Sequence, residues 1–130
     1  MTNQELIAKA KEAMTKAYAP YSHFQVGAAL LAKDGRVFTG CNVENATYGA
    51  TICAERTAVT KAVSEGVREF EKIAIVASSG DYAAPCGICR QVLFEFMPEG
   101  KVVLWSELEG EKEFALTELL PFGFCGEDIK

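Results

Sequence analysis

Histidine is nearly absent from the 130-residue sequence, which contains only His23. A histidine-rich metal site or a Cys–His catalytic dyad therefore has almost no side chains to draw on. The sequence also contains no run of Lys or Arg. Its 13 Lys and Arg are outnumbered by 18 Asp and Glu, which gives a formal net charge of -5. Because non-specific nucleic-acid binding depends mainly on basic patches that neutralise phosphates, a polynucleotide partner is disfavoured.

Long apolar runs are also missing, because no stretch reaches the ~20 residues that a membrane-spanning helix needs. The N-terminus lacks the basic segment followed by an apolar one that marks a secretory signal. Five cysteines without such a signal argue against a disulfide framework and favour metal binding or thiol reactivity. We therefore expect a soluble, cytoplasmic protein without a membrane partner.

The composition is that of a folded protein, with 49% hydrophobic and 24% charged residues. A length of 130 residues suits one domain, and neither a linker nor an internal repeat divides the chain. We therefore expect residues 1–130 to form a single domain.

Helix and strand signals alternate along this domain. Four helices are predicted. The first begins at a Thr2–Glu5 capping box and ends before Pro20, and the second runs from near Cys53 to Gly66. The third lies within 84–100, and the last is a short turn at 117–122. The predicted strands flank a turn at Asp34-Gly35 and cover 72–78, 101–105 and, more weakly, 112–118. This order predicts an α/β fold, a three-layer α/β/α sandwich with a mixed sheet of about five strands.

Three cysteines can share one metal ion. Cys86 and Cys89 are spaced i and i+3 on the first turn of a predicted helix, which places both sulfurs on one face. Cys53 starts another predicted helix, and helix N-termini favour thiolate over thiol. Successive strand–helix units bring such N-termini together at the carboxyl edge of a sheet, so the three sulfurs are expected to meet there.

Three protein ligands with one open position are typical of catalytic zinc. A lone Cys-x-x-Cys would fit a redox dithiol or half of a structural zinc site equally well, but Glu55 accompanies Cys53. At a helix start the non-helical cap lets both side chains lean inward, so Glu55 is a candidate proton shuttle. Its partner would be a water whose pKa zinc lowers towards ~7. Zinc deaminases carry this Cys-x-Glu and Pro-Cys-x-x-Cys pattern.

Five segments of the sequence resemble cytidine deaminases of the small homotetrameric type, in the cytidine/deoxycytidylate deaminase family. They are "APYSHFQVGAAL" (19–30), "GCNVENATYG" (40–49), "CAERTA" (53–58), "PCGICRQ" (85–91) and "ELLPFGF" (118–124). The resemblance spans nearly the whole chain, and an ordered set of this kind is far more specific than any single motif.

The resemblance implies hydrolytic deamination of cytidine and 2′-deoxycytidine to uridine and 2′-deoxyuridine with release of ammonia, a reaction of pyrimidine salvage. Cys53, Cys86 and Cys89 would hold one zinc ion per chain, and zinc-bound hydroxide would attack C4 of the base. Glu55 would take the proton of the water, then protonate N3 and the departing amine.

The resemblance also implies a set of substrate contacts in a homotetramer. Asn42 and Glu44 would bind the ribose 3′-hydroxyl, Phe24 would stack on the base, backbone near Ala54 would contact the base edge, and Phe124 would reach the pocket of a neighbouring subunit. Outside the family context, Asn42 and Glu44 would be assigned to a turn, Phe24 to the core, and Glu55 to an exposed first helical turn.

Arg56 fits an electrostatic need of this site. Three thiolates on Zn²⁺ carry a formal charge of -1, which weakens Lewis acidity. A guanidinium that donates hydrogen bonds to the sulfurs draws charge off them, so we expect Arg56 to tune the metal. Arg90, which follows Cys89, could act in the same way or face solvent.

The remaining thiols and the histidine have plainer interpretations. Cys41 and Cys125 are more simply small buried hydrophobes than further ligands, and His23 is more simply a surface side chain than a fourth ligand. Phe122, like Phe124, would lie over the core or in a subunit contact.

Three other functions stay open. The first is a structural-zinc interaction module whose Cys₄ site is completed by Cys41 or Cys125, and the second is a thiol redox protein that uses Cys86 and Cys89. The third is a deaminase of another cytosine-containing nucleoside.

Overall fold

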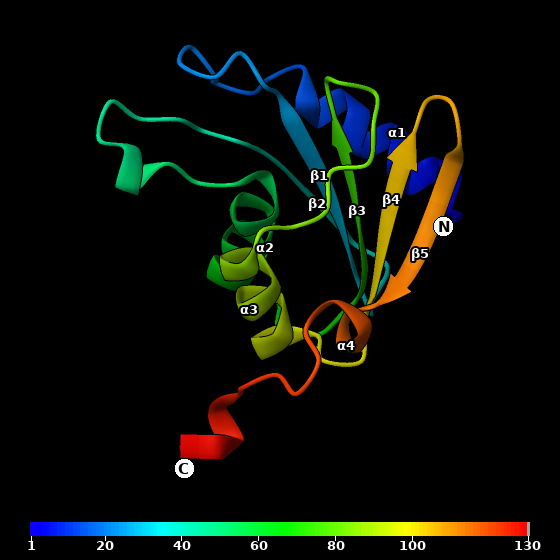
Figure 1. Cartoon of the computed structure of the whole chain (residues 1–130). Helices are drawn as coiled ribbons and strands as arrows, with labels where there is room; N and C mark the ends of the chain where they lie inside the picture. Colours follow the sequence, from blue (N-terminus) through cyan, green and yellow to red (C-terminus); the bar gives the residue numbers. More distant parts are fainter. Residues whose placement is uncertain (130) are drawn as a thin grey trace.

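The sheet and its helices are described for residues 1–129 in a computed structural model (Figure 1). In chain order the elements are α1 (Asn3–Met14), β1 (Val26–Ala32), β2 (Val37–Cys41), the 3₁₀ helix η1 (Tyr48–Ala50), α2 (Ala54–Ser64), β3 (Phe70–Ala77), α3 (Gly87–Phe96), β4 (Lys101–Ser106), β5 (Gly110–Ala115), α4 (Leu116–Leu119) and the 3₁₀ helix η2 (Gly126–Ile129).

The five strands found in the described part of the chain form one sheet in the order β2-β1-β3-β4-β5. β3 and β4 pair in parallel, whereas the other neighbouring strands pair antiparallel. The predicted hairpin is present, and Gly35 adopts the left-handed backbone (φ 96°) that its turn requires. The prediction of a mixed five-stranded sheet is therefore confirmed.

Helices cover both faces of the sheet, as Figure 1 shows. β1 divides its side chains between two cores: Ala29 and Leu31 pack with α1, whereas Ala28 and Leu30 pack on the side of α2 and α3. Such burial on both faces explains why β1 and residues 73–77 of β3 are wholly apolar. The three-layer α/β/α architecture is confirmed.

Two element boundaries differ from the predictions. α1 begins at the predicted Thr2–Glu5 capping box but ends at Met14, well before Pro20, because the Tyr18 backbone pairs with residues 42–44 instead. β5 ends at Ala115 because the Glu118 carboxylate accepts the Ala115 N–H (2.8 Å) and starts α4. Both boundaries depend on hydrogen bonds that hydrophobic spacing does not encode.

Glycine lets α2 approach the sheet closely at the end that carries the site. A Cβ atom on Gly40 of β2 would lie 2.6 Å from the backbone nitrogen of Ala58, inside van der Waals contact. Gly27 of β1 makes the equivalent approach to α1, where a Cβ would lie 2.6 Å from the Met14 nitrogen. Gly40 therefore fixes the height of α2, and with it the height of Cys53 and Glu55.

Candidate active site

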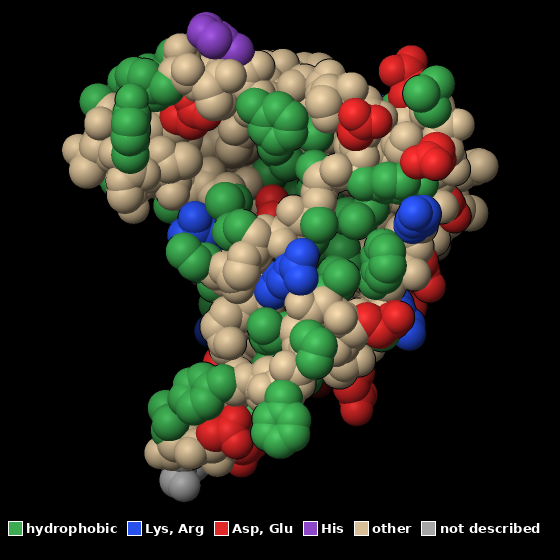
Figure 2. Space-filling view, viewed as in Figure 1, with side chains coloured by type: hydrophobic (Ala, Val, Ile, Leu, Met, Phe, Trp, Pro, Cys, Tyr) green, Lys and Arg blue, Asp and Glu red, His purple; other side chains and the backbone are tan. Residues whose placement is uncertain are grey.

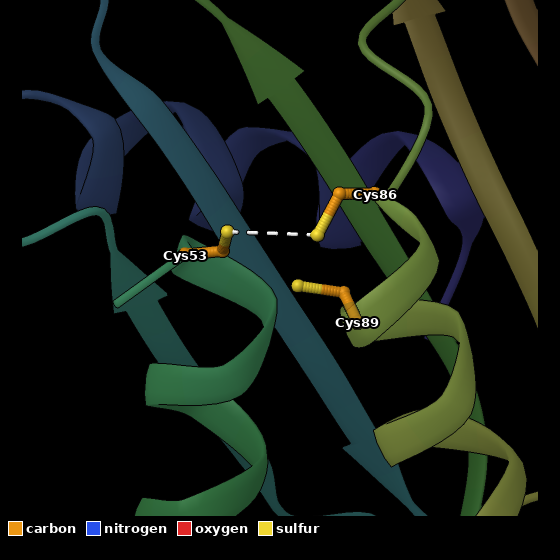
Figure 3. Close-up of side chains that lie close together, drawn as sticks. All are labelled: Cys53, Cys86 and Cys89. Carbon is orange, nitrogen blue, oxygen red and sulfur yellow. Dashed lines mark hydrogen bonds between the residues drawn. The ribbon is translucent and has the colours of Figure 1, made fainter. Parts of the chain in front are cut away.

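Three sulfur atoms converge where α2 and α3 begin (Figure 3). Cys53 and Cys86 are the N-cap residues of the two helices, both with extended backbone, and Cys89 lies on the first turn of α3. The three Sγ atoms lie within 4.8 Å of one another, and the Cys53 and Cys86 sulfurs are 3.9 Å apart. Two sulfurs bonded to one tetrahedral zinc at ~2.3 Å would lie ~3.8 Å apart, so the group fits zinc.

The group offers three ligands and no fourth among residues 1–129. Cys41 and Cys125 lie outside the group. Both thiols are half-buried, whereas the sequence predicted that they would be fully buried. His23 is exposed and also lies outside the group, in agreement with the surface interpretation. A closed Cys₄ site, as a structural-zinc module needs, is therefore not formed within residues 1–129.

The thiols of Cys53 and Cys89 differ in the direction of their pKa shifts. A hydrogen bond from Cys89, followed by smaller contributions from Arg56 and Cys86, lowers the pKa of Cys53 to about 5 against the cost of burial. The same hydrogen bond to Cys53, together with burial, raises the pKa of Cys89. The site thus favours thiolate at Cys53, the protonation state in which cysteine binds a metal.

Arg56 lies against these sulfurs. Its Nη2 atom donates to Cys53 Sγ at 3.6 Å and to the Thr51 carbonyl at 3.4 Å. Its Nε atom is buried and has no hydrogen-bond partner among residues 1–129. The hydrogen bond to Cys53 raises the pKa of Arg56, so a fixed positive charge lies beside the thiolate group.

Glu55 is buried in the first turn of α2, with 5% of its surface exposed. Burial raises the pKa of its carboxyl group above the ordinary value. The alternative of an exposed first-turn glutamate that only complements the helix dipole is therefore wrong.

A cavity of about 280 Å³ opens beside the cysteines. The predicted site residues that line it are Phe24, Asn42, Glu44, Cys53, Ala54, Glu55 and Cys86. The space-filling view shows the same face hollowed between the upper loops and the helices (Figure 2). This volume is close to the lower end of small-molecule sites, which run from ~300 Å³ upwards.

Asn42 and Glu44 reach the cavity while they also hold the loop at 18–25. Asn42 is buried, accepts from the Val26 N–H (2.9 Å) and donates to the Phe24 carbonyl (2.8 Å). Glu44 accepts from the N–H groups of Tyr21 (3.0 Å) and Ser22 (3.1 Å) through one oxygen. These contacts exclude the interpretation of both residues as mere turn or solvent-facing positions.

Ser22 belongs to the site although sequence reasoning did not single it out. Its hydroxyl donates to the second oxygen of Glu44, and this hydrogen bond is the leading cause of the lowered pKa of that carboxyl. The two residues are 22 positions apart, so no local spacing could have shown the contact.

The aromatic residues divide between the cavity and the outer surface. Phe24 lines the cavity with 41% of its surface exposed, which excludes the core interpretation. Phe124 lies outside the cavity of its own chain with 54% exposed, and Phe122 is fully exposed, so neither covers the core.

Arg90 holds backbone rather than sulfur. It donates to the carbonyls of Pro85 (2.7 Å) and Leu119 (2.8 Å), which ties the entrance of α3 to the end of α4. Neither of the two roles considered for Arg90, charge tuning or exposure to solvent, describes this arrangement.

Within residues 1–129, no helix combines the length and apolar character needed to cross a membrane.

Known proteins are similar to this chain in sequence and in fold. The family model of the cytidine and deoxycytidylate deaminase zinc-binding region matches residues 1–105. A cytidine deaminase of Halalkalibacterium halodurans is 52% identical over 130 residues, covering 99% of this chain and 98% of the relative. One from Sporosarcina psychrophila is 49% identical, with 99% and 96% covered.

A solved structure agrees with these relatives. The crystal structure of cytidine deaminase from Burkholderia pseudomallei superposes with a TM-score of 0.91 at 50% identity, covering 95% of this chain and all of that one. The expected zinc cofactor is supported by both the family model and the three converging thiols. From sulfur geometry to full-length similarity, the observations agree: the chain belongs to the cytidine and deoxycytidylate deaminase family.

Proposed function

We propose that this chain converts cytidine and 2′-deoxycytidine to uridine and 2′-deoxyuridine by hydrolysis, with release of ammonia, as an enzyme of pyrimidine salvage. The observation that carries the proposal is the cavity of about 280 Å³, which is lined by two of the three converging thiols and by the buried Glu55. The curated relatives with about 50% identity over the full chain, each a cytidine deaminase, support the choice of substrate.

Cys53, Cys86 and Cys89 would hold the zinc ion through their thiolates. Zinc, when bound, supplies Lewis acidity that makes water a nucleophile near neutral pH. The helix N-termini at Cys53 and Cys86 stabilise the thiolate form of both ligands. The positive charge of Arg56 offsets part of the negative charge that an all-thiolate ligand set brings.

Glu55 would move the protons of the reaction. Its carboxylate would take one proton from the attacking water and deliver it to N3 of the base, and would then take the proton of the hydroxyl added at C4 and deliver it to the leaving amine. One carboxyl group serves these steps because each proton that it accepts is the one that it next delivers. Its burial keeps bulk water away from this relay.

The other cavity residues would bind the nucleoside. The exposed ring of Phe24 offers a surface on which a pyrimidine stacks, and the backbone near Ala54 offers polar groups to the base edge. Asn42 supplies a donor and Glu44 an acceptor for the ribose 3′-hydroxyl.

Four copies of the chain would assemble, with Phe124 entering the pocket of a neighbouring subunit. The chain after α4 extends away from the sheet (Figure 1), and exposed apolar side chains gather on it (Figure 2). Exposed apolar groups of this kind mark contact surfaces. A cytoplasmic location is supported by five cysteines that are all free thiols.

The test compares wild type with Glu55→Gln. Deamination of cytidine is followed by the change in ultraviolet absorbance, and zinc per chain is measured on the same samples. We expect Glu55→Gln to keep zinc but to lose deamination, because the amide cannot relay protons. The matched control is Glu12→Gln, an exposed position on α1, which should keep both. A Glu55→Gln variant as active as wild type would refute the proposed mechanism.

A further inference from the structure

The Ser22 hydroxyl lies between two residues assigned to substrate binding. The Phe24 N–H donates to Ser22 Oγ at 3.0 Å. Because an ionised carboxylate can only accept, the Ser22 hydroxyl donates its own hydrogen to the second carboxylate oxygen of Glu44. The Ser22 hydroxyl thus links the backbone of Phe24, which is proposed to stack on the base, to the carboxylate of Glu44, which is proposed to bind the ribose.

The turn around Ser22 is built to present these donors together. His23 has a left-handed backbone (φ 59°), uncommon for a residue with a side chain, and its N–H donates to the Ala19 carbonyl at 3.0 Å. The N–H groups of Tyr21 and Ser22 both donate to the other oxygen of Glu44. Within residues 1–129, the three hydrogen-bond donors found for this carboxylate therefore all come from one turn.

Phe24 is held a second time, independently of Ser22. The Asn42 side chain donates to the Phe24 carbonyl at 2.8 Å and accepts from the Val26 N–H at 2.9 Å. Loss of the Ser22 hydroxyl would therefore leave Phe24 anchored through Asn42, whereas Glu44 would lose the donor that fixes its second oxygen. The effect should fall mainly on the ribose contact.

We propose that Ser22 is a positioning residue that fixes the Glu44 carboxylate relative to Phe24 and so confers preference for nucleosides with a 3′-hydroxyl. This inference rests on the proposed cytidine deaminase function. A carboxylate held by several donors is already oriented for the ribose, so its ordering does not have to occur on binding. A nucleoside that lacks the 3′-hydroxyl does not use this orientation and gains little from it.

The experiment measures kcat and KM for cytidine and 3′-deoxycytidine with wild type and Ser22→Ala. A lost hydrogen bond to a charged group supports an expected fall of about tenfold in kcat/KM for cytidine, mainly through KM. For 3′-deoxycytidine the change should stay within about twofold. Ser22→Thr, which keeps a hydroxyl, should retain most of the wild-type kcat/KM for cytidine.

The matched control is Ser78→Ala. The Ser78 hydroxyl accepts from the Gln25 N–H at 3.0 Å, so it also holds the 18–25 loop, but no bond to Glu44 is found for it. This variant should affect both nucleosides equally. If Ser22→Ala does not fold, Ser22→Cys, with a weak donor of similar size, should show the same selective loss at smaller amplitude.

Equal losses on both nucleosides, or no loss on cytidine, would overturn the positioning role while leaving the proposed function intact. A wild-type chain that does not deaminate cytidine would overturn the proposed function and this inference with it. A loss confined to the substrate with a 3′-hydroxyl supports both.

Discussion

Single side chains set the charge around the three cysteines. After Glu55, Arg56 is the most informative residue to substitute. Its Nη2 atom is 3.6 Å from Cys53 Sγ. Because groups that hydrogen-bond metal ligands typically contribute about 10- to 100-fold to activity or affinity, we expect Arg56→Gln to lower kcat by that order in zinc-loaded protein. Its thermal midpoint should change little. Unchanged turnover of a fully zinc-loaded variant would exclude the tuning role.

Arg90→Gln is the natural comparison, because Arg90 also lies close to a cysteine in sequence but holds two backbone carbonyls. We expect this variant to have a lower thermal midpoint, because it loses two partly buried hydrogen bonds to backbone carbonyls. Its kcat should fall less than that of Arg56→Gln when both are measured with zinc bound.

Glu44 gives the fold a defined pH dependence. The Ser22 hydroxyl, then neighbouring backbone N–H groups, lower the pKa of Glu44, and the nearby His23 acts in the same direction. A carboxyl whose pKa is lower in the folded than in the unfolded chain stabilises the fold above the unfolded value, and this contribution is lost as pH falls through the folded pKa.

The thermal midpoints of wild type and Glu44→Gln should therefore differ most near neutral pH. The difference should shrink as pH falls below the ordinary glutamate pKa of about 4.3. Titration by NMR should also show the pKa of Glu44 rising in Ser22→Ala. A midpoint difference that is constant with pH would contradict this assignment.

Single elements set the height of the site above the sheet, and Gly40 is where α2 meets β2. A Cβ at Gly40 would lie 2.6 Å from the Ala58 nitrogen, so Gly40→Ala must displace α2 or the strand. Overpacking of this kind costs about 1–3 kcal/mol of stability. Because α2 carries Cys53 and Glu55, we also expect weaker zinc binding and lower kcat.

Gly27→Ala provides the matched control for this prediction. It crowds α1 in the same way, on the face of the sheet opposite to the site. Both variants should unfold at lower temperature, but only Gly40→Ala should lose zinc affinity. Equal effects on zinc affinity would mean that the height of α2 does not matter to the site.

The elements that could be predicted were those with local signals. The Thr2–Glu5 capping box, the Asp34-Gly35 turn and the apolar run of β3 each carry their structure within a few residues. The end of α1 could not be predicted, because it depends on pairing between Tyr18 and residues 42–44. The short helix η1 was missed as well, since no residue of it is buried and no side chain caps it.

The candidate site divides in the same way. Cys86 and Cys89 were predictable as a pair from their spacing, and Cys53 joined them through the expected helix geometry. The assignment of Asn42 and Phe24 came only from the family resemblance, because their contacts with the cavity join segments far apart in sequence. Ser22 had neither signal, and only the folded loop shows it beside Glu44.

The chain is proposed to act as a tetramer. Mixing variant chains then tests whether a neighbouring subunit completes each pocket. We expect elution at about four times the 14.1 kDa mass of one chain. Phe124→Ala should weaken substrate binding, because each pocket would lack the ring of its neighbour. Mixed tetramers of Phe124→Ala and Glu55→Gln chains should regain activity, since some pockets combine an intact Glu55 with a Phe124 from the adjacent subunit.

Each variant assembled alone should remain impaired, and this supplies the control. Mixed samples whose activity is no higher than the average of the separate ones would contradict a pocket completed across subunits.

We propose that Cys53, Cys86 and Cys89 hold the zinc ion on which cytidine deamination depends. The most direct measurement is cytidine turnover and zinc per chain on the same wild-type samples through a chelator titration and re-addition of zinc. One zinc ion per chain at full activity, with turnover falling and recovering in proportion to bound zinc, is the predicted result. Full turnover by chains from which zinc has been removed would exclude a zinc-dependent reaction at these thiols.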